Sequence, residues 1–142
     1  MDYPGIWKLK EMLWLVDGKF RKISDTEIAS LENSEHNREL KCMFRAEFII
    51  SETSLDVLYS PAEGEESFAR QKGWTHTERG FLIQSFPCRI ADGVLFLDYL
   101  SKGLEYTPTW VDETGCLVLS GGILKIQKAQ TDLCQEGQTN DE

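Results

Sequence analysis

Short stretches of alternating apolar and polar residues, separated by turn-forming dipeptides, dominate this sequence. Asp17-Gly18 is a strong hairpin signal, and further turns are expected at Asp92-Gly93, Lys102-Gly103, 112–115 and Gly121-Gly122. No long helical pattern separates these turns. Frequent turns between short strands are typical of an antiparallel β-sandwich or β-barrel. The sequence therefore predicts a mainly β fold.

The longest predicted strand runs from Ile6 to Val16. Trp7, Leu9 and Leu13 share one of its faces at a period of two, and Glu11 is the polar member of that face. We expect the face to point into the core. An ionised carboxylate among apolar walls needs a partner or takes up a proton, so Glu11 is a candidate for binding a cationic or hydrogen-bonding group.

A capping-box pattern follows the first hairpin. Ser24 and Glu27 stand three residues apart, the spacing at which each can satisfy the backbone of the other. The pattern predicts a short helix over 25–31, and the polar run 32–39 is expected to form a further helical turn or a loop. One or two helices would then cover one end of the β fold.

The remainder of the chain is predicted to be strands. In residues 42–50 every second side chain is apolar, which favours a half-buried strand with one inward face; these side chains are Cys42, Phe44, Ala46, Phe48 and Ile50. A later strand over 80–90 is expected to bend at Pro87, because proline cannot donate a ladder hydrogen bond. The other expected strands cover residues 55–59, 94–99, 104–110, 116–119 and 123–128.

This order of elements resembles the calycin superfamily, which includes lipocalins and intracellular fatty-acid-binding proteins. The resemblance lies in the Gly5-x-Trp7-Lys8-Leu9 opening, the capped helical segment and the meander of hairpins, and it is strongest to lipocalin-like proteins of gut Firmicutes. It implies a single up-and-down antiparallel β-barrel over residues 1–129. Polar and acidic residues dominate from Gln130 onward, so we expect the acidic tail, 130–142, to be disordered.

The resemblance also implies a role for Trp7, the tryptophan at the start of the first strand. In the family this residue closes the floor of the barrel and packs under a basic residue of the last strand. Lys125 and Lys128 are the candidates for that basic residue here, and Lys125 is also a possible partner for Glu11. The last strand lacks the Arg-x-Tyr pair with which fatty-acid carriers hold a carboxylate, so the resemblance implies the fold rather than that site.

The charge balance narrows the classes of partner. The 142 residues include 24 acidic and 15 basic ones, for a formal net charge of −9. Nucleic acids and anionic membrane surfaces both require clustered basic residues, so neither partner is expected. The start of the chain has no basic segment followed by an apolar run, and no stretch is long and apolar enough to span a membrane, which makes the cytoplasm the expected compartment.

No motif for metal binding or catalysis is present in the sequence. His36 and His76 are isolated, and the cysteines form no CxxC pair. Cys42, Cys88 and Cys116 lie among apolar residues and are expected to be small core residues. We predict no catalytic residue, no metal site and no cofactor.

Aromatic residues supply the candidate ligand site. An eight-stranded barrel is just wide enough to be filled by side chains or to hold one small ligand. The first hypothesis is a protein that binds a small apolar or amphipathic molecule inside the barrel. The alternatives are a solid barrel that acts as a protein-interaction scaffold, and an enzyme that uses an interior carboxylate and tyrosine. The predicted lining residues are Trp7, Glu11, Phe48, Phe81, Tyr99, Tyr106 and Trp110.

Overall fold

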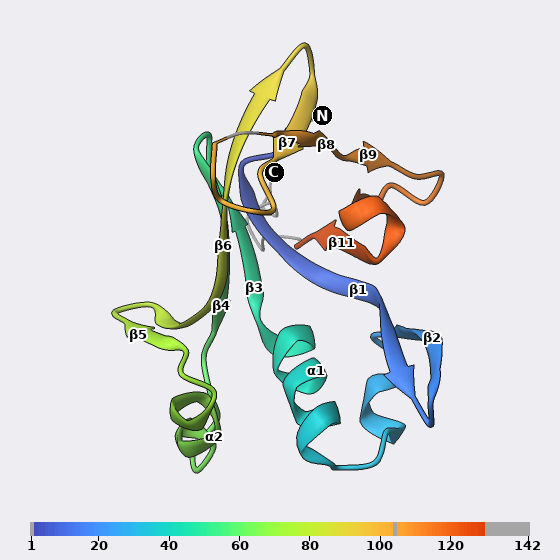
Figure 1. Cartoon of the computed structure of the whole chain (residues 1–142), viewed down its shortest axis with the longest axis vertical. Coiled ribbons are helices and arrows are strands. Elements are labelled where there is room, and N and C mark those ends of the chain that lie inside the picture. Colours follow the sequence, from blue (N-terminus) through green and yellow to red (C-terminus); the bar gives the residue numbers. More distant parts are fainter. Residues whose placement is uncertain (1, 104, 130–142) are drawn as a thin grey trace, which may run out of the picture.

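The computed structural model describes residues 2–103 and 105–129, which form a nearly closed antiparallel β-barrel (Figure 1). The predicted disordered tail, 130–142, lies outside the described residues. The fold is mainly β with a short helix near the N-terminus, as the sequence predicts. The strands are β1 (Gly5–Val16), β2 (Lys19–Ser24), β3 (Glu47–Ile50), β4 (Ser54–Tyr59), β5 (Thr75–Thr77), β6 (Gly80–Ala91), β7 (Val94–Leu97), β8 (Thr107–Pro108), β9 (Trp110–Val111), β10 (Leu117–Leu119) and β11 (Leu124–Lys128).

The barrel is an up-and-down meander with two excursions. Neighbouring strands follow the order β8-β7-β6-β4-β3-β1-β11-β10-β9, while β2 pairs only with β1 and β5 only with β6. The two ends of this path, β8 and β9, flank Thr109 in the chain. The Thr109 amide donates to the Leu95 carbonyl oxygen at 2.9 Å. The short segment 107–111 therefore pairs with β7 through β8 and with β10 through β9. Because it joins the two ends of the strand order, it brings the barrel close to closure.

The Asp-Gly hairpins form as predicted. Asp17 and Gly18 have φ values of 52° and 80°, and Asp92 and Gly93 have values of 53° and 77°. Two successive positive φ angles match the right-handed twist of the flanking strands. These two turns join β1 to β2 and β6 to β7.

The main helix corrects the prediction of a strand over 42–50. Helix α1 (Glu35–Arg45) includes the first part of that segment, and the strand β3 begins only at Glu47. The helix starts at Ser34, whose hydroxyl oxygen accepts a hydrogen bond from the Asn37 amide at 3.2 Å. The buried residues Asn37, Leu40 and Phe44 recur every three to four positions. Phe44 thus belongs to two patterns: the helical spacing of Asn37, Leu40 and Phe44, and the alternation of 42, 44 and 46 that predicts a strand.

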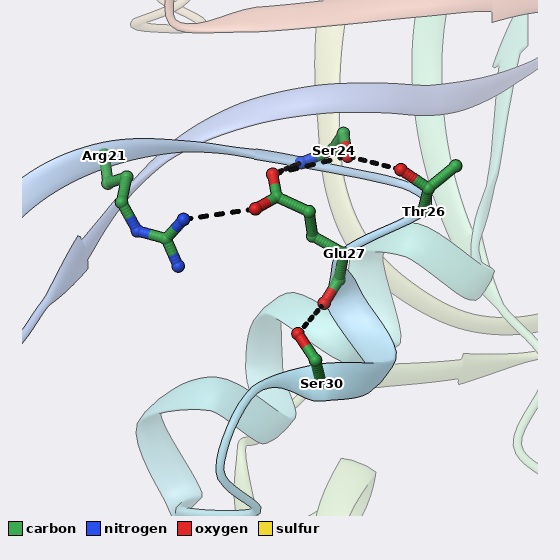
Figure 2. A network of polar contacts seen from close by, with 5 residues as sticks. All are labelled: Arg21, Ser24, Thr26, Glu27 and Ser30. Carbon is green, nitrogen blue, oxygen red and sulfur yellow. Dashed lines mark hydrogen bonds and ion pairs between the residues drawn. The ribbon is translucent and has the colours of Figure 1, made fainter.

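The predicted capping box is only half formed (Figure 2). The Glu27 carboxylate accepts a hydrogen bond from the Ser24 amide at 3.2 Å, which lowers the pKa of Glu27, and Arg21 pairs with the same carboxylate at 3.1 Å. The Ser24 hydroxyl instead lies 2.9 Å from the Thr26 hydroxyl. Ser24 is the last residue of β2, and the helix that follows is one 3₁₀ turn, η1 (Ile28–Ser30). The predicted helix over 25–31 is therefore wrong in extent.

One further segment differs from the prediction. Residues Glu66–Gln71 form a short helix, α2, and α1 and α2 both lie at the end of the molecule opposite the tip of the β6–β7 hairpin (Figure 1). Strand β6 continues through Pro87, at the position where its partner changes from β4 to β7. Pro87 thus stands at the junction of two ladders, where the amide that proline lacks is not needed in the middle of either one.

Trp7 is buried at one end of the barrel, with 1% of its surface exposed. Its indole N–H donates to the Tyr3 carbonyl at 2.8 Å, and the Lys128 ammonium lies 6.0 Å from its ring centroid. Lys128, rather than Lys125, is therefore the basic residue beside Trp7. A Cβ on Gly5 would lie 2.8 Å from the Lys128 side chain, and the φ of +142° at Gly5 also favours glycine.

The three predicted core cysteines are confirmed as buried. Cys42, Cys88 and Cys116 are free thiols, each with 7% or less of its surface exposed. Burial raises the pKa of Cys42, and it raises the pKa of Cys88 to about 11. Both thiols therefore remain protonated at neutral pH and pack as small apolar groups.

Candidate ligand cavity

A cavity of about 590 Å³ lies inside the barrel. Its deep walls are fully buried residues such as Phe48, Leu55 and Leu97, whereas Gln84 and Ile123 are exposed and mark where the cavity meets solvent. The volume lies within the range of small-molecule sites, roughly 300–1,000 Å³. The lining residues are Met12, Met43, Phe48, Leu55, Val57, Gln84, Phe86, Leu97, Tyr99, Thr107, Leu119, Ser120, Gly121, Ile123 and Leu124.

No charged side chain lines this cavity among the residues that the structure describes. Its polar groups are the side chains of Gln84, Tyr99, Thr107 and Ser120. The Tyr99 hydroxyl oxygen accepts a hydrogen bond from the Ser120 amide at 2.7 Å, so its own proton is available for an acceptor in the cavity. The Tyr99 ring is fixed edge-to-face against Phe86, with 5.5 Å between centroids.

Two of the predicted lining residues, Phe48 and Tyr99, lie on the cavity. Two others are buried elsewhere. Trp7 fills the end of the barrel beside Lys128, and Phe81 is 1% exposed and packs against the tilted ring of His76, with 4.7 Å between ring centroids. Neither ring belongs to the cavity wall.

Glu11 does not line the cavity, because the register of β1 shifts next to it. Leu9 pairs with Ile126, but Glu11 pairs with the next residue along, Lys125. One extra residue in β1 exchanges the two faces of the strand beyond that point. Met12 lines the cavity as a result. The ammonium of Lys125 lies 3.0 Å from the carboxylate of Asp112, so its ion-pair partner is not Glu11.

Tyr106 and Trp110 also lie away from the cavity. The Tyr106 ring packs under the guanidinium of Arg89, 4.3 Å from its centroid. Trp110 is 49% exposed on β9. The predicted strand over 104–110 places both inside, whereas the structure has only two short strands around Thr109, with Trp110 just after the buried residue.

The sequence-based reasoning missed the two methionines of the cavity. Simple alternation puts Met12 on the opposite face of the first strand from Trp7 and Leu9, and only the bulge places it inside. Met43 lies on α1, in a segment predicted as a strand. The available signal was the apolar run Met12, Trp14 and Val16, whose members pack partly against the core.

No group of three or more histidine, cysteine, aspartate or glutamate side chains within residues 2–103 and 105–129 is arranged to hold a metal ion. In the same residues, no helix has the length and apolar character needed to cross a membrane. No protein-family model, curated protein or solved structure matches the chain.

Proposed function

We propose that this barrel binds a small, uncharged and mainly apolar molecule that carries a hydrogen-bond acceptor. The observation that carries the proposal is the 590 Å³ cavity with ten apolar side chains and no charged one among its lining residues. Burying apolar ligand surface there is favourable by about 25 cal/mol per Å². A carboxylate or ammonium would lose its hydration without gaining a partner.

The Tyr99 hydroxyl supports the polar part of the proposal. Since the Ser120 amide occupies its oxygen, Tyr99 is oriented to donate a hydrogen bond to a ligand oxygen. The contact between Trp7 and Lys128 supports a lipocalin-like identity, which we propose alongside the binding function. The two alternatives from the sequence gain less support. A cavity of this size disfavours a solid scaffold. An enzyme that uses an interior carboxylate is disfavoured because the described lining residues include no Asp or Glu.

Displacement of Nile red, an uncharged apolar dye, tests the proposal. We expect the dye to bind with enhanced fluorescence, and 1-decanol to displace it at lower concentration than decanoate of the same chain length. Val57→Phe fills part of the cavity and is expected to weaken dye binding several-fold. Val111→Phe is the matched control, because Val111 is 39% exposed on β9 and outside the cavity.

Three results would contradict the proposal. Failure of the folded protein to bind the dye would remove the binding function. Equal weakening by Val57→Phe and Val111→Phe would place the dye outside the barrel. Stronger displacement by decanoate than by decanol would refute the preference for an uncharged ligand.

A further inference from the structure

A second pocket, of about 160 Å³, lies beside α1 and shares no lining residue with the apolar cavity. Arg38, Lys41 and Arg45 all line it. Their spacing of three and four residues places the three side chains on one face of the helix. The pocket therefore concentrates positive charge on a chain whose net charge is −9.

One of the three cations is neutralised within the pocket. The Arg45 guanidinium lies 2.8 Å from the Glu65 carboxylate, and the Tyr59 hydroxyl donates to the same carboxylate oxygen at 2.7 Å. The hydrogen bond from Tyr59 and the nearby Arg45 hold the pKa of Glu65 below its usual value. Glu65 and Arg45 together contribute no net charge.

The other two cations have no ion-pair partner among the described residues. The Arg38 guanidinium lies over the Phe68 ring, 4.4 Å from its centroid, and both residues line the pocket. Lys41 donates one hydrogen bond, to the Leu31 carbonyl at 2.9 Å, and retains two further N–H donors. The charge of the pocket is thus about +2.

We propose that this pocket binds a phosphate group. A phosphate monoester carries about −1.5 to −2 charges at pH 7, which matches the two unpaired cations, whereas a carboxylate would neutralise only one of them. Arginine presents paired N–H groups to phosphate oxygens, and lysine adds a point charge with rotatable donors. The pocket, at about 160 Å³, is far larger than the space that one water molecule needs, which leaves room for a phosphate group.

The adjoining surface distinguishes free phosphate from a phosphate ester. A neighbouring pocket of about 280 Å³ shares Lys41 and Arg45 with this one, and its other lining residues are Ile28, Ala29, Phe44 and Asp25, whose carboxylate is paired with Lys10. An ester with an apolar organic group has room there, which inorganic phosphate does not use. We therefore compare inorganic phosphate with phenyl phosphate as the two probes.

The experiment is a ¹H–¹⁵N NMR titration of the full chain at constant ionic strength, with sodium chloride as the reference salt. Saturable shifts of the α1 amides are expected with phosphate and absent with chloride. Arg38→Gln and Lys41→Gln should each weaken binding by about tenfold, as expected when one hydrogen bond between charged groups is lost. Glu65→Gln should tighten binding, because it removes the negative charge in the pocket and frees Arg45.

Arg70→Gln is the matched control and should leave phosphate binding unchanged. Arg70 is also an exposed arginine stacked on an aromatic ring, that of Phe81, but it pairs with Glu66 outside the pocket. Each variant's spectrum reports whether the fold is intact. Shifts that chloride reproduces, or phosphate affinity that does not change in folded Arg38→Gln, would overturn the proposal. Tighter binding of phenyl phosphate identifies an ester as the ligand class, and equal binding identifies the free anion.

Discussion

The two ends of the barrel are built from the same strands but are filled differently. At one end Trp7, Leu117 and Ile126 are each 1% exposed or less, and the interior is packed. Toward the other end, Met12 and Leu124 continue two of the same strands but line a cavity of about 590 Å³. The packed end receives a large ring from β1, whereas the cavity is bordered by the flexible side chains Met12 and Met43.

This difference shows that the strand framework does not by itself decide whether the interior is solid or hollow. Strand β11 passes through both regions: Ile126 pairs with Leu9 and Leu117, and Leu124 pairs with Met12 and Leu119. Whether a region of the barrel is a packed core or a cavity therefore depends on which side chains each strand directs inward. Substitutions at the two ends should affect stability unequally.

The largest effect is expected at the packed end. Trp7→Ala should lower the free energy of unfolding by about 3–5 kcal/mol, because it leaves a cavity where the ring is fully enclosed. Trp110→Ala is the control at an exposed position and should cost less than about 1 kcal/mol. Equilibrium urea unfolding followed by fluorescence measures both. Similar losses for the two variants would contradict the assignment of Trp7 as the closure of the barrel.

A second pair of substitutions compares the two ends along one strand. Ile126→Ala should cost about 2–5 kcal/mol, as for other fully buried aliphatic residues. Leu124→Ala should cost about 1–2 kcal/mol, because this half-buried side chain already borders a void and has fewer packing partners to lose. Urea unfolding of both variants gives the comparison. A loss at Leu124 as large as that at Ile126 would mean that the cavity region is packed as tightly as the closed end.

The smallest effect concerns the helix that borders the cavity. Ser34→Ala should cost about 1 kcal/mol, because the hydroxyl that caps α1 is lost. Ser24→Ala should stay within about 0.5 kcal/mol, since the Ser24 hydroxyl caps no helix amide. Urea unfolding and the helical circular-dichroism signal measure the two changes. The reverse order would show that the capping box at Ser24, and not Ser34, nucleates the helical segment.

The local signals in the sequence predicted the barrel but not the contents of its interior. Asp-Gly turns at 17–18 and 92–93 act through backbone preferences of the turn residues themselves, so they could be read directly. The position of Trp7 was also predictable, because its strand alternates regularly up to Leu9. Beyond that residue the bulge reverses the faces of β1, and a bulge is settled by pairing with β11 and β2, which the sequence of β1 does not contain.

The basic pocket shows the same limit in a helix. Arg38, Lys41 and Arg45 lie on one face only because residues 35–45 are helical, and the alternation at Cys42, Phe44 and Ala46 fits a strand equally well. Tertiary packing of Leu40 and Phe44 against the barrel selected the helix. Tyr59 and Glu65 come from distant segments, so no local pattern links them to these cations.

By itself, the sequence determined the mainly β class, the hairpins, the acidic surface charge and the buried tryptophan, because each follows from local preference, composition or unbroken alternation. Only the tertiary structure decided that Met12 replaces Glu11 in the interior, that α1 contributes Met43 to the cavity, and that two unpaired cations meet at one pocket. The physical reason is that register, bulges and the choice between helix and strand depend on which distant residues are available as partners.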